Sequence, residues 1–237
     1  MTELIRISKR ISNSGFCSRR DAEKIIMSGR VKVNNEVITS LSLKISLKDI
    51  VKVDNKIINL SDIIRIWLYH KKKGYLVTNK DPFKRPTIFE DLKNKINIKF
   101  ISVGRLDFNS EGLLILTNNG DLARKLELPS SGYLRKYKVK VRGVVDKLKL
   151  ESLKNGIKIN KINYGSIISR IINQNENYTW LDVSLKEGKN REIRKVFLHL
   201  GYKVNRLIRI SFGPFNLKNI KPGEVAEVKQ NKVKNLI

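Results

Sequence analysis

The chain has one cysteine and two histidines among its 237 residues. Cys17 cannot form an internal disulfide, so we expect the protein to work in a reducing compartment. Two histidines cannot build a histidine-rich metal site, and a single cysteine cannot complete a structural zinc site. We therefore expect no bound metal.

Long apolar runs are also missing. No stretch approaches the roughly 18 consecutive apolar residues that a membrane-spanning helix needs. No apolar N-terminal segment leads to a small-residue cleavage site. These absences predict a soluble, cytoplasmic protein that makes no membrane contact.

Acidic residues are scarce relative to basic ones. Asp and Glu number 22 against 49 Lys and Arg, which gives a formal charge of +27. A charge of this sign and size is typical of proteins that displace counterions from a phosphate backbone. The composition therefore favours a polyanionic partner. Since 41% of the residues are apolar, the chain can still bury a core.

Residues 1–60 are predicted to form a small domain of two helices and a few short strands. The helices are expected at residues 8–14 and 19–27, the second opened by a capping box at Ser18 and stopped by Gly29. After Gly29 apolar residues recur at every second position, which indicates strands. Turns are expected at residues 34–35 and 54–55.

Three basic side chains, Arg19, Arg20 and Lys24, gather at the start of the second predicted helix. Cations there cost about half a kcal/mol each when exposed, because the helix dipole is positive at that end. Phosphate binding gives a reason for them that helix stability does not.

Residues 61–237 are predicted to form a larger mixed α+β domain with a largely antiparallel sheet. The boundary is placed in the tether at residues 59–65. Strands are expected at residues 66–70, 74–78, 113–116, 137–141, 167–172, 180–185 and 204–210, and helices at residues 87–92, 122–126 and 191–200.

One carboxylate has an unusual position. Asp107 lies in a tight loop directly before the fully apolar stretch 113–116. The overall charge of the chain is strongly basic, so it does not explain why an acid stands just before an apolar strand. Chemistry on a nucleic acid is the reason we favour.

Two sets of motifs resemble known families. Residues 6–9, 18–26 and 29–34 resemble the small RNA-binding domain named after ribosomal protein S-four. Residues 104–107 with 112–118, then 135–139, then 188–195 resemble the three motifs of RsuA-class ribosomal RNA pseudouridine synthases. Together the two resemblances span nearly the whole chain.

The resemblance implies isomerisation of uridine to pseudouridine by an Asp-dependent reaction that needs no cofactor, on a base flipped out of the RNA. Asp107 is then the nucleophile or general base, and Tyr137 stacks on the uracil or moves a proton. Arg194 is expected to pair with Asp107 and keep it ionised. The implied RNA-binding residues are Arg6, Lys9, Arg19, Arg20, Lys24, Arg30, Arg105 and Arg191. The expected partner is ribosomal RNA, with the large-subunit branch the nearer one, or a pre-ribosomal particle, and the protein is expected to be a monomer.

Other interpretations of the same residues remain open. Tyr137 could be a core strand tyrosine, and Arg105 could hold the loop rather than fill the space left by an extruded base. Glu192 stands where related motifs often carry Gln, which leaves its role open. At the level of function, the chain could be a ribosome-assembly factor without turnover. It could also be a hydrolase that uses Asp107 with Glu111 as paired carboxylates.

Overall fold

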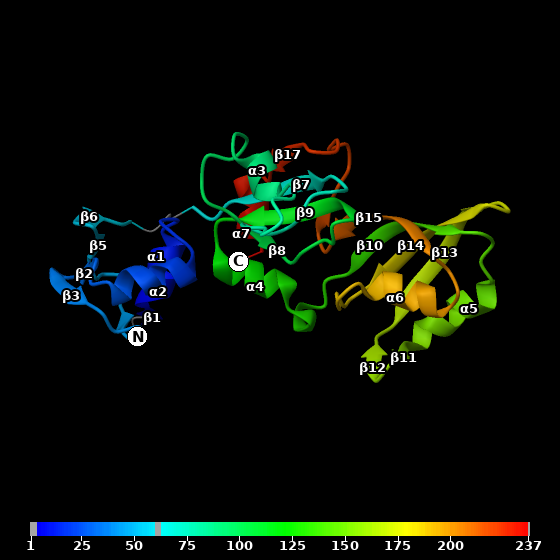
Figure 1. Ribbon diagram of the computed structural model, residues 1–237, viewed down its shortest axis with the longest axis horizontal. Coiled ribbons are helices and arrows are strands. Elements are labelled where there is room, and N and C mark those ends of the chain that lie inside the picture. Colours follow the sequence, from blue (N-terminus) through cyan, green and yellow to red (C-terminus); the bar gives the residue numbers. More distant parts are fainter. Residues whose placement is uncertain (1–3, 60–62, 237) are drawn as a thin grey trace. The chain divides into compact units, whose positions relative to one another are not determined.

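The computed structural model describes residues 4–59 and 63–236. The chain divides into a small unit, made of Met1–Arg65, Asn97–Ile101 and Thr117–Gly120, and a large unit, made of Ile66–Ile96, Ser102–Leu116 and Asp121–Ile237. The boundary predicted at residue 60 lies outside the described residues. Figure 1 labels the elements of both units.

The small unit packs two helices against short antiparallel strands. Its helices are α1 (Ile7–Asn13) and α2 (Arg19–Met27). Its strands are β1 (Ile5–Arg6), which pairs with β4 (Lys44–Ile45), and the four-stranded sheet β3-β2-β5-β6 formed by Glu36–Ile38, Val31–Val33, Val51–Val53 and Lys56–Ile57. Apolar side chains from both helices and from β2, β4 and β5 form one buried cluster. Burial of this shared apolar face is what holds such short elements together.

The local signals of the small unit act as predicted. The Ser18 hydroxyl accepts a hydrogen bond from the Asp21 amide at 3.2 Å and donates one to the Asp21 carboxylate, which fixes the start of α2. Gly29 ends that helix with φ +70°. Both predicted turns have two successive residues with positive φ, the pattern of the tight hairpin turn that Asn and Asp tolerate.

The large unit is built on a mixed sheet, and the mixed α+β class is confirmed. Within the described residues the sheet has nine strands, in the order β13-β14-β10-β15-β9-β7-β17, with β16 on β15 and β8 on β9. The strands are β7 (Ile66–Lys71), β8 (Ile101–Val103), β9 (Glu111–Thr117), β10 (Arg135–Arg142), β13 (Ile167–Gln174), β14 (Tyr178–Leu185), β15 (Val204–Phe212), β16 (Phe215–Asn216) and β17 (Val225–Glu227). Their pairings are antiparallel at β13–β14, β14–β10, β10–β15, β15–β16 and β17–β7, and parallel at β15–β9.

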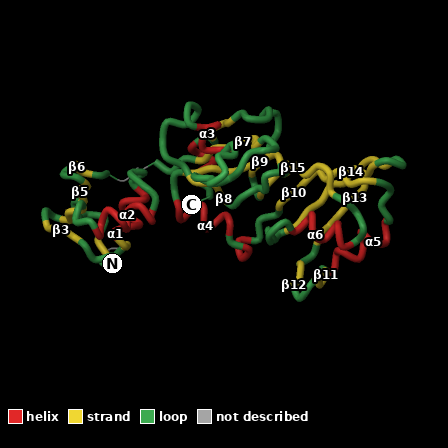
Figure 2. The backbone as a smooth tube through the Cα atoms, in the orientation of Figure 1, coloured by secondary structure: helices red, strands yellow, loops and turns green. Residues whose placement is uncertain are grey.

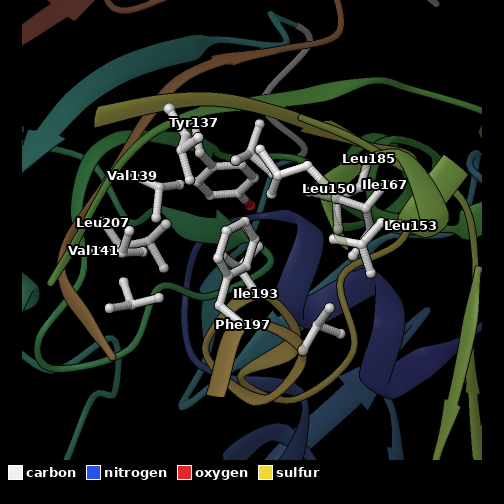
Figure 3. Close-up of a cluster of buried hydrophobic side chains, with 14 of the residues drawn as sticks. Tyr137, Val139, Val141, Leu150, Leu153, Ile167, Leu185, Ile193, Phe197 and Leu207 are labelled. Carbon is white, nitrogen blue, oxygen red and sulfur yellow. The ribbon is translucent and has the colours of Figure 1, made fainter. Parts of the chain in front are cut away.

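Two helices of the large unit pack against the sheet beside strands β10, β14 and β13. The large-unit helices are α3 (Ile88–Leu92), α4 (Gly120–Glu127), α5 (Lys147–Ser152), α6 (Glu192–His199) and α7 (Gln230–Lys234). Figure 2 shows α5 and α6 in red beside the strands β10, β14 and β13. Ile193 and Phe197 of α6 meet Val139 and Val141 of β10 in one buried cluster, and Tyr137 belongs to the same cluster (Figure 3). The inward alternation of β10 therefore places Tyr137 on the helix-covered face.

Some predicted elements differ from the structure. The strand predicted at residues 74–78 is absent, and only an isolated bridge joins Leu76 to Thr87 there. The strand before it runs on through Lys71, which had been placed in the break between two strands. The small hairpin of β11 (Ile157–Ile159) and β12 (Ile162–Tyr164), together with α5, was not predicted. None of the helices in the described ranges has the length and apolar character that a membrane crossing requires.

The parallel pair β9–β15 depends on a glycine. Gly112 lies opposite Arg209 with φ +101°. A Cβ atom at Gly112 would lie 2.3 Å from the Arg209 carbonyl oxygen and 2.7 Å from its amide nitrogen. Both atoms belong to backbone that the sheet holds in place, so no side-chain rotation relieves the clash.

We expect Gly112→Ala to lower the free energy of unfolding by at least about 3 kcal/mol, the sum of backbone strain and overpacking. Gly143→Ala is the matched control. Gly143 also has positive φ, but a Cβ atom added there would meet no other atom within 4 Å. That variant should lose only about 1 kcal/mol, the cost of the left-handed conformation. Urea unfolding of both variants measures the difference, and equal losses would contradict the close approach.

Candidate active site

A cleft of about 950 Å³ opens in the large unit and brings together residues from distant parts of the sequence. Asp107 lines the cleft from the loop before β9, and Tyr137 lines it from β10. Arg191, the residue just before α6, lines it too. Arg105 lines the cleft as well. Four of the predicted site residues, separated by up to 86 positions, therefore share one cavity.

The Asp107 turn is fixed through its backbone. Four consecutive carbonyl oxygens, those of residues 107 to 110, each accept a hydrogen bond. The Phe108 carbonyl accepts one from the Gly74 amide at 2.8 Å, and the Asn109 carbonyl accepts one from the Arg194 guanidinium at 2.9 Å. The Ser110 amide closes the turn by donating to the Asp107 carbonyl at 3.0 Å. A loop bound at every carbonyl holds its one carboxylate in a defined place.

Lys71 is the centre of this arrangement. Its side chain is fully buried, and its ammonium group donates to the carbonyls of Lys72 at 3.0 Å, Asp107 at 3.1 Å and Ser110 at 2.8 Å. Burial lowers its pKa to about 8, against an opposing effect of the nearby Asp107 and Glu111 carboxylates. An ammonium group with three N–H donors and three carbonyl acceptors is fully satisfied, which explains how a lysine can be buried here.

The ion pair predicted between Asp107 and Arg194 is replaced by one with Arg191. The Arg191 Nη1 atom lies 3.8 Å from the Asp107 Oδ2 atom. Arg191 precedes α6 with a left-handed φ of +53°, and it was predicted only as an RNA contact. Arg194 lies within α6, and its Nη1 and Nη2 groups donate to the carbonyls of Val204 and Asn109. One of its donors therefore holds the turn that carries Asp107, another holds β15, and neither binds the carboxylate itself.

Arg194 still belongs to the electrostatics of the site. Burial lowers the pKa of its guanidinium, the Arg191 cation lowers it further, and the Asp107 carboxylate opposes both. Arg191 and Arg194, three residues apart, thus act on the same acid in different ways. Arg191 faces the carboxylate, and Arg194 holds the turn that presents it.

Three adjacent strands carry the site across the sheet. Gly112 of β9 is opposite Arg209 of β15, and Arg209 is opposite Tyr137 of β10. Arg209 is only 3% exposed, and its Nε group donates to the Leu113 carbonyl at 2.7 Å. The parallel pairing therefore fixes how far the Asp107 loop lies from Tyr137 along the sheet.

The wall of the cleft beyond Tyr137 is basic and buried. The guanidinium of Arg135 lies 4.5 Å from the Phe212 ring centroid and that of Arg209 lies 5.2 Å from it. Burial lowers the pKa of Arg135. Glu192 also lines this wall, and burial raises the pKa of its carboxyl. Its Oε2 atom accepts a hydrogen bond from the Lys189 amide at 2.8 Å, so Glu192 fixes the chain as it approaches α6.

Glu111 does not pair with Asp107. Its carboxylate accepts two hydrogen bonds from Arg206, at 2.8 and 2.9 Å, and that contact lowers its pKa. Glu111 is also not among the residues that line the cleft. The paired carboxylates that a glycoside hydrolase needs are therefore not brought together.

The remaining predicted RNA contacts lie in the small unit. Arg19, Arg20 and Lys24 are exposed on α2, as their spacing indicates, with Arg19 at 4.0 Å from Glu23. Arg30 is exposed too, but its guanidinium binds the Asp54 carboxylate in a two-point contact. Arg6 is exposed on β1, and Lys9 is half-buried on α1.

The sequence analysis missed Lys71 and Arg209. Lys71 occupies an inward position at the end of an alternating apolar strand, which was a usable signal. For Arg209 the chain offers no comparable signal, since only the β9–β15 pairing shows what it contacts. Among the residues that the structure describes, no group of three or more His, Cys, Asp or Glu side chains could hold a metal ion.

The pKa of Lys71 predicts a pH effect on stability. Its pKa is about 8 in the folded chain and about 10.4 in an unfolded one. Between these values the unfolded chain binds a proton that the folded chain lacks, so the unfolding free energy rises with pH. Relative to Lys71→Met, which cannot titrate, the unmodified protein should gain about 2 kcal/mol from pH 7 to pH 10. Urea unfolding at both pH values tests this, and a constant difference would contradict it.

Comparisons with known proteins point to one family. The family model described as RNA pseudouridylate synthase matches residues 65–199, and the S4 domain model matches residues 5–51. A Rickettsia felis protein named "Uncharacterized RNA pseudouridine synthase" is 46% identical over 96% of this chain and 98% of its own length. "Ribosomal large subunit pseudouridine synthase B" of Haemophilus influenzae is 39% identical over 91% of this chain and 61% of its own length. The solved structure "Crystal structure of pseudouridylate synthase" has the same fold, with a TM-score of 0.69 at 24% identity, covering 98% of this chain and all of the other.

The family match covers more than half of the chain, and relatives of high identity span almost all of it. The fold and the cleft belong to the same large unit that the family model matches. This chain is therefore an isomerase of the RNA pseudouridylate synthase family, and it carries an N-terminal S4 domain.

Proposed function

We propose that this enzyme converts a specific uridine of ribosomal RNA, in the large subunit, to pseudouridine. The observation that carries the proposal is the cleft in which Asp107, Tyr137 and Arg191 meet on a rigid backbone. The choice of substrate is supported by the curated relatives from Haemophilus influenzae and Pasteurella multocida, whose names give large-subunit activity. The charge of +27 suits an RNA substrate.

Asp107 is proposed to act directly in the reaction. The bond from ribose C1′ to uracil N1 breaks, a bond from C1′ to C5 forms, the C5 proton leaves and N1 takes up a proton. No redox change occurs and no group is lost, so a carboxylate acting as nucleophile or base suffices. The Arg191 guanidinium, 3.8 Å away, is the cation that faces this carboxylate.

Tyr137 and Arg105 are proposed to act on the base. Tyr137 is largely buried on the face of the sheet that lines the cleft, where its ring can stack on a uracil and its hydroxyl can move a proton. Arg105 is exposed at the cleft beside Asp107. An exposed guanidinium there can occupy the space that an extruded base leaves in the RNA stack.

The small unit is proposed to dock structured RNA by phosphate contacts. Arg19, Arg20 and Lys24 form an exposed basic group on α2. Arg6, Lys9 and Arg30 extend the same domain's basic character, although Arg30 already binds Asp54. We propose residues 1–60 as the docking domain and residues 61–237 as the catalytic domain of a monomeric enzyme.

The first test compares the protein with Asp107→Asn on ribosomal RNA from cells that lack the enzyme. Pseudouridine is mapped by carbodiimide-stop sequencing. We expect one new stop in large-subunit RNA with the protein, and a turnover rate lower by at least about 10³-fold with the variant. RNA affinity should change little, because the charge serves chemistry rather than phosphate contact.

Glu111→Gln is the matched control for the test of Asp107. It removes a neighbouring carboxylate that binds Arg206 instead of facing the cleft, so turnover should persist. Equal inactivation by both substitutions would favour paired-carboxylate chemistry. Absence of any new stop, on naked RNA and on ribosomal particles alike, would favour an assembly factor without turnover.

The docking role of α2 predicts a change in salt dependence. Replacing Arg19, Arg20 and Lys24 together by Gln should reduce the slope of log affinity against log salt by about 2 to 3, since each phosphate contact contributes about 0.9. The control replaces the exposed residues Lys147, Lys158 and Lys161 by Gln, which removes the same charge from the large unit. Equal slopes for the two triple variants would mean that net charge alone acts.

A further inference from the structure

The loop between β7 and α3 exposes an aromatic ring at its tip. Phe83 is 77% exposed, more than any other described phenylalanine. Neither core cluster of the described residues includes it. A ring this exposed contributes little to folding, because burial is what makes an aromatic side chain stabilising.

The loop is nevertheless rigid. At its base the Leu76 amide donates to the Pro86 carbonyl and the Ile88 amide donates to the Leu76 carbonyl, both at 2.9 Å. At its tip the Asp81 carboxylate accepts hydrogen bonds from the amides of Phe83 and Arg85, at 3.2 and 3.0 Å, and from the Arg85 guanidinium at 2.7 and 3.1 Å. These contacts, chiefly those from Arg85, lower the pKa of Asp81 to about 2, so the hydrogen bonds to its carboxylate persist at neutral pH.

The same loop forms part of the cleft wall. Thr78, Lys80, Asp81 and Arg85 line the cavity that contains Asp107. Phe83 lies between two of these wall residues in the chain, at the outer end of the loop. Lys80 and Lys84 are exposed on either side of it. An exposed ring flanked by cations at the rim of a cleft has the composition of a single-stranded RNA contact.

One side of the ring already has a partner. The Arg85 guanidinium carbon lies 5.2 Å from the Phe83 ring centroid, and Asp81 holds that guanidinium in place. A cation backing the ring fixes its orientation while most of its surface stays in contact with solvent. The ring is thus oriented before any ligand arrives.

We infer that Phe83 is a stacking platform for an unpaired nucleobase of the RNA substrate, next to the uridine that enters the cleft. The inference rests on the proposed function, since it concerns the RNA bound at that same cleft. Stacking on an aromatic ring is sequence-tolerant, because every base has a π face. Phe83 would then select for an unpaired base beside the target, whatever the identity of that base.

The test measures the affinity of the full-length protein for large-subunit ribosomal RNA, together with KM and kcat from tritium released by RNA labelled at uridine C5. Phe83→Ala and Phe83→Leu both remove the π face, and Phe83→Tyr and Phe83→Trp keep it. The control is Leu148→Ala on α5, whose side chain is 79% exposed and is not among those lining the cleft.

We expect Phe83→Ala and Phe83→Leu to weaken RNA affinity and raise KM by about 10-fold, the size of one base-stacking contact. Their kcat should change little, and Phe83→Tyr, Phe83→Trp and Leu148→Ala should stay within about twofold of the unmodified protein in every measurement.

A fully active Phe83→Ala with unchanged affinity overturns the stacking role and leaves the proposed function standing. A normal Phe83→Leu overturns it too, because a plain apolar contact would then suffice. An unmodified protein that binds this RNA but releases no tritium counts against the proposed function, while the affinities of the variants still decide the role of Phe83.

Discussion

The site depends on one buried ammonium group. Lys71 donates to the carbonyls at both ends of the Asp107 turn, and its fully buried position leaves no water to replace those bonds. The Arg194 guanidinium and the Gly74 amide bind the two carbonyls between them. The Asp107 turn is thus attached to β7 through Lys71 and to α6 through Arg194. A carboxylate on such a turn is oriented before substrate arrives, which is what lets a small number of groups carry a reaction.

The basic side chains of this protein have different contacts on the surface and in the interior. On the surface, Arg19, Arg20 and Lys24 are exposed and suited to phosphate. Arg191 lines the cleft and faces Asp107, while Arg194 and Arg209 donate to backbone carbonyls. Asp81 holds its loop through Arg85, and both Asp81 and Asp107 line the same cleft.

The parallel contact of β9 with β15 joins the two halves of the large unit's sheet. It brings Gly112 so close to the Arg209 backbone that only glycine fits. On the far side of β15, Tyr137 is opposite Arg209. The spacing between the acid loop and the tyrosine is therefore set by hydrogen-bond register rather than by flexible side chains.

Much of the architecture could be predicted from the sequence because its signals are local. The Ser18 cap, the turns at Asn34–Asn35 and Asp54–Asn55, and the alternation of β10 act within a few residues. They determined the second helix of the small unit, its hairpin turns and the strand of Tyr137. Motif order likewise placed Asp107 and Tyr137 in one site. The partner of Asp107 needed the fold, because Arg191 and Arg194 lie three residues apart and only the left-handed turn before α6 decides which one faces the acid. The roles of Lys71 and Arg209 also became visible only in the tertiary structure. Their hydrogen bonds join strands and loops 36 to 96 positions apart, and no local pattern encodes contacts over such distances.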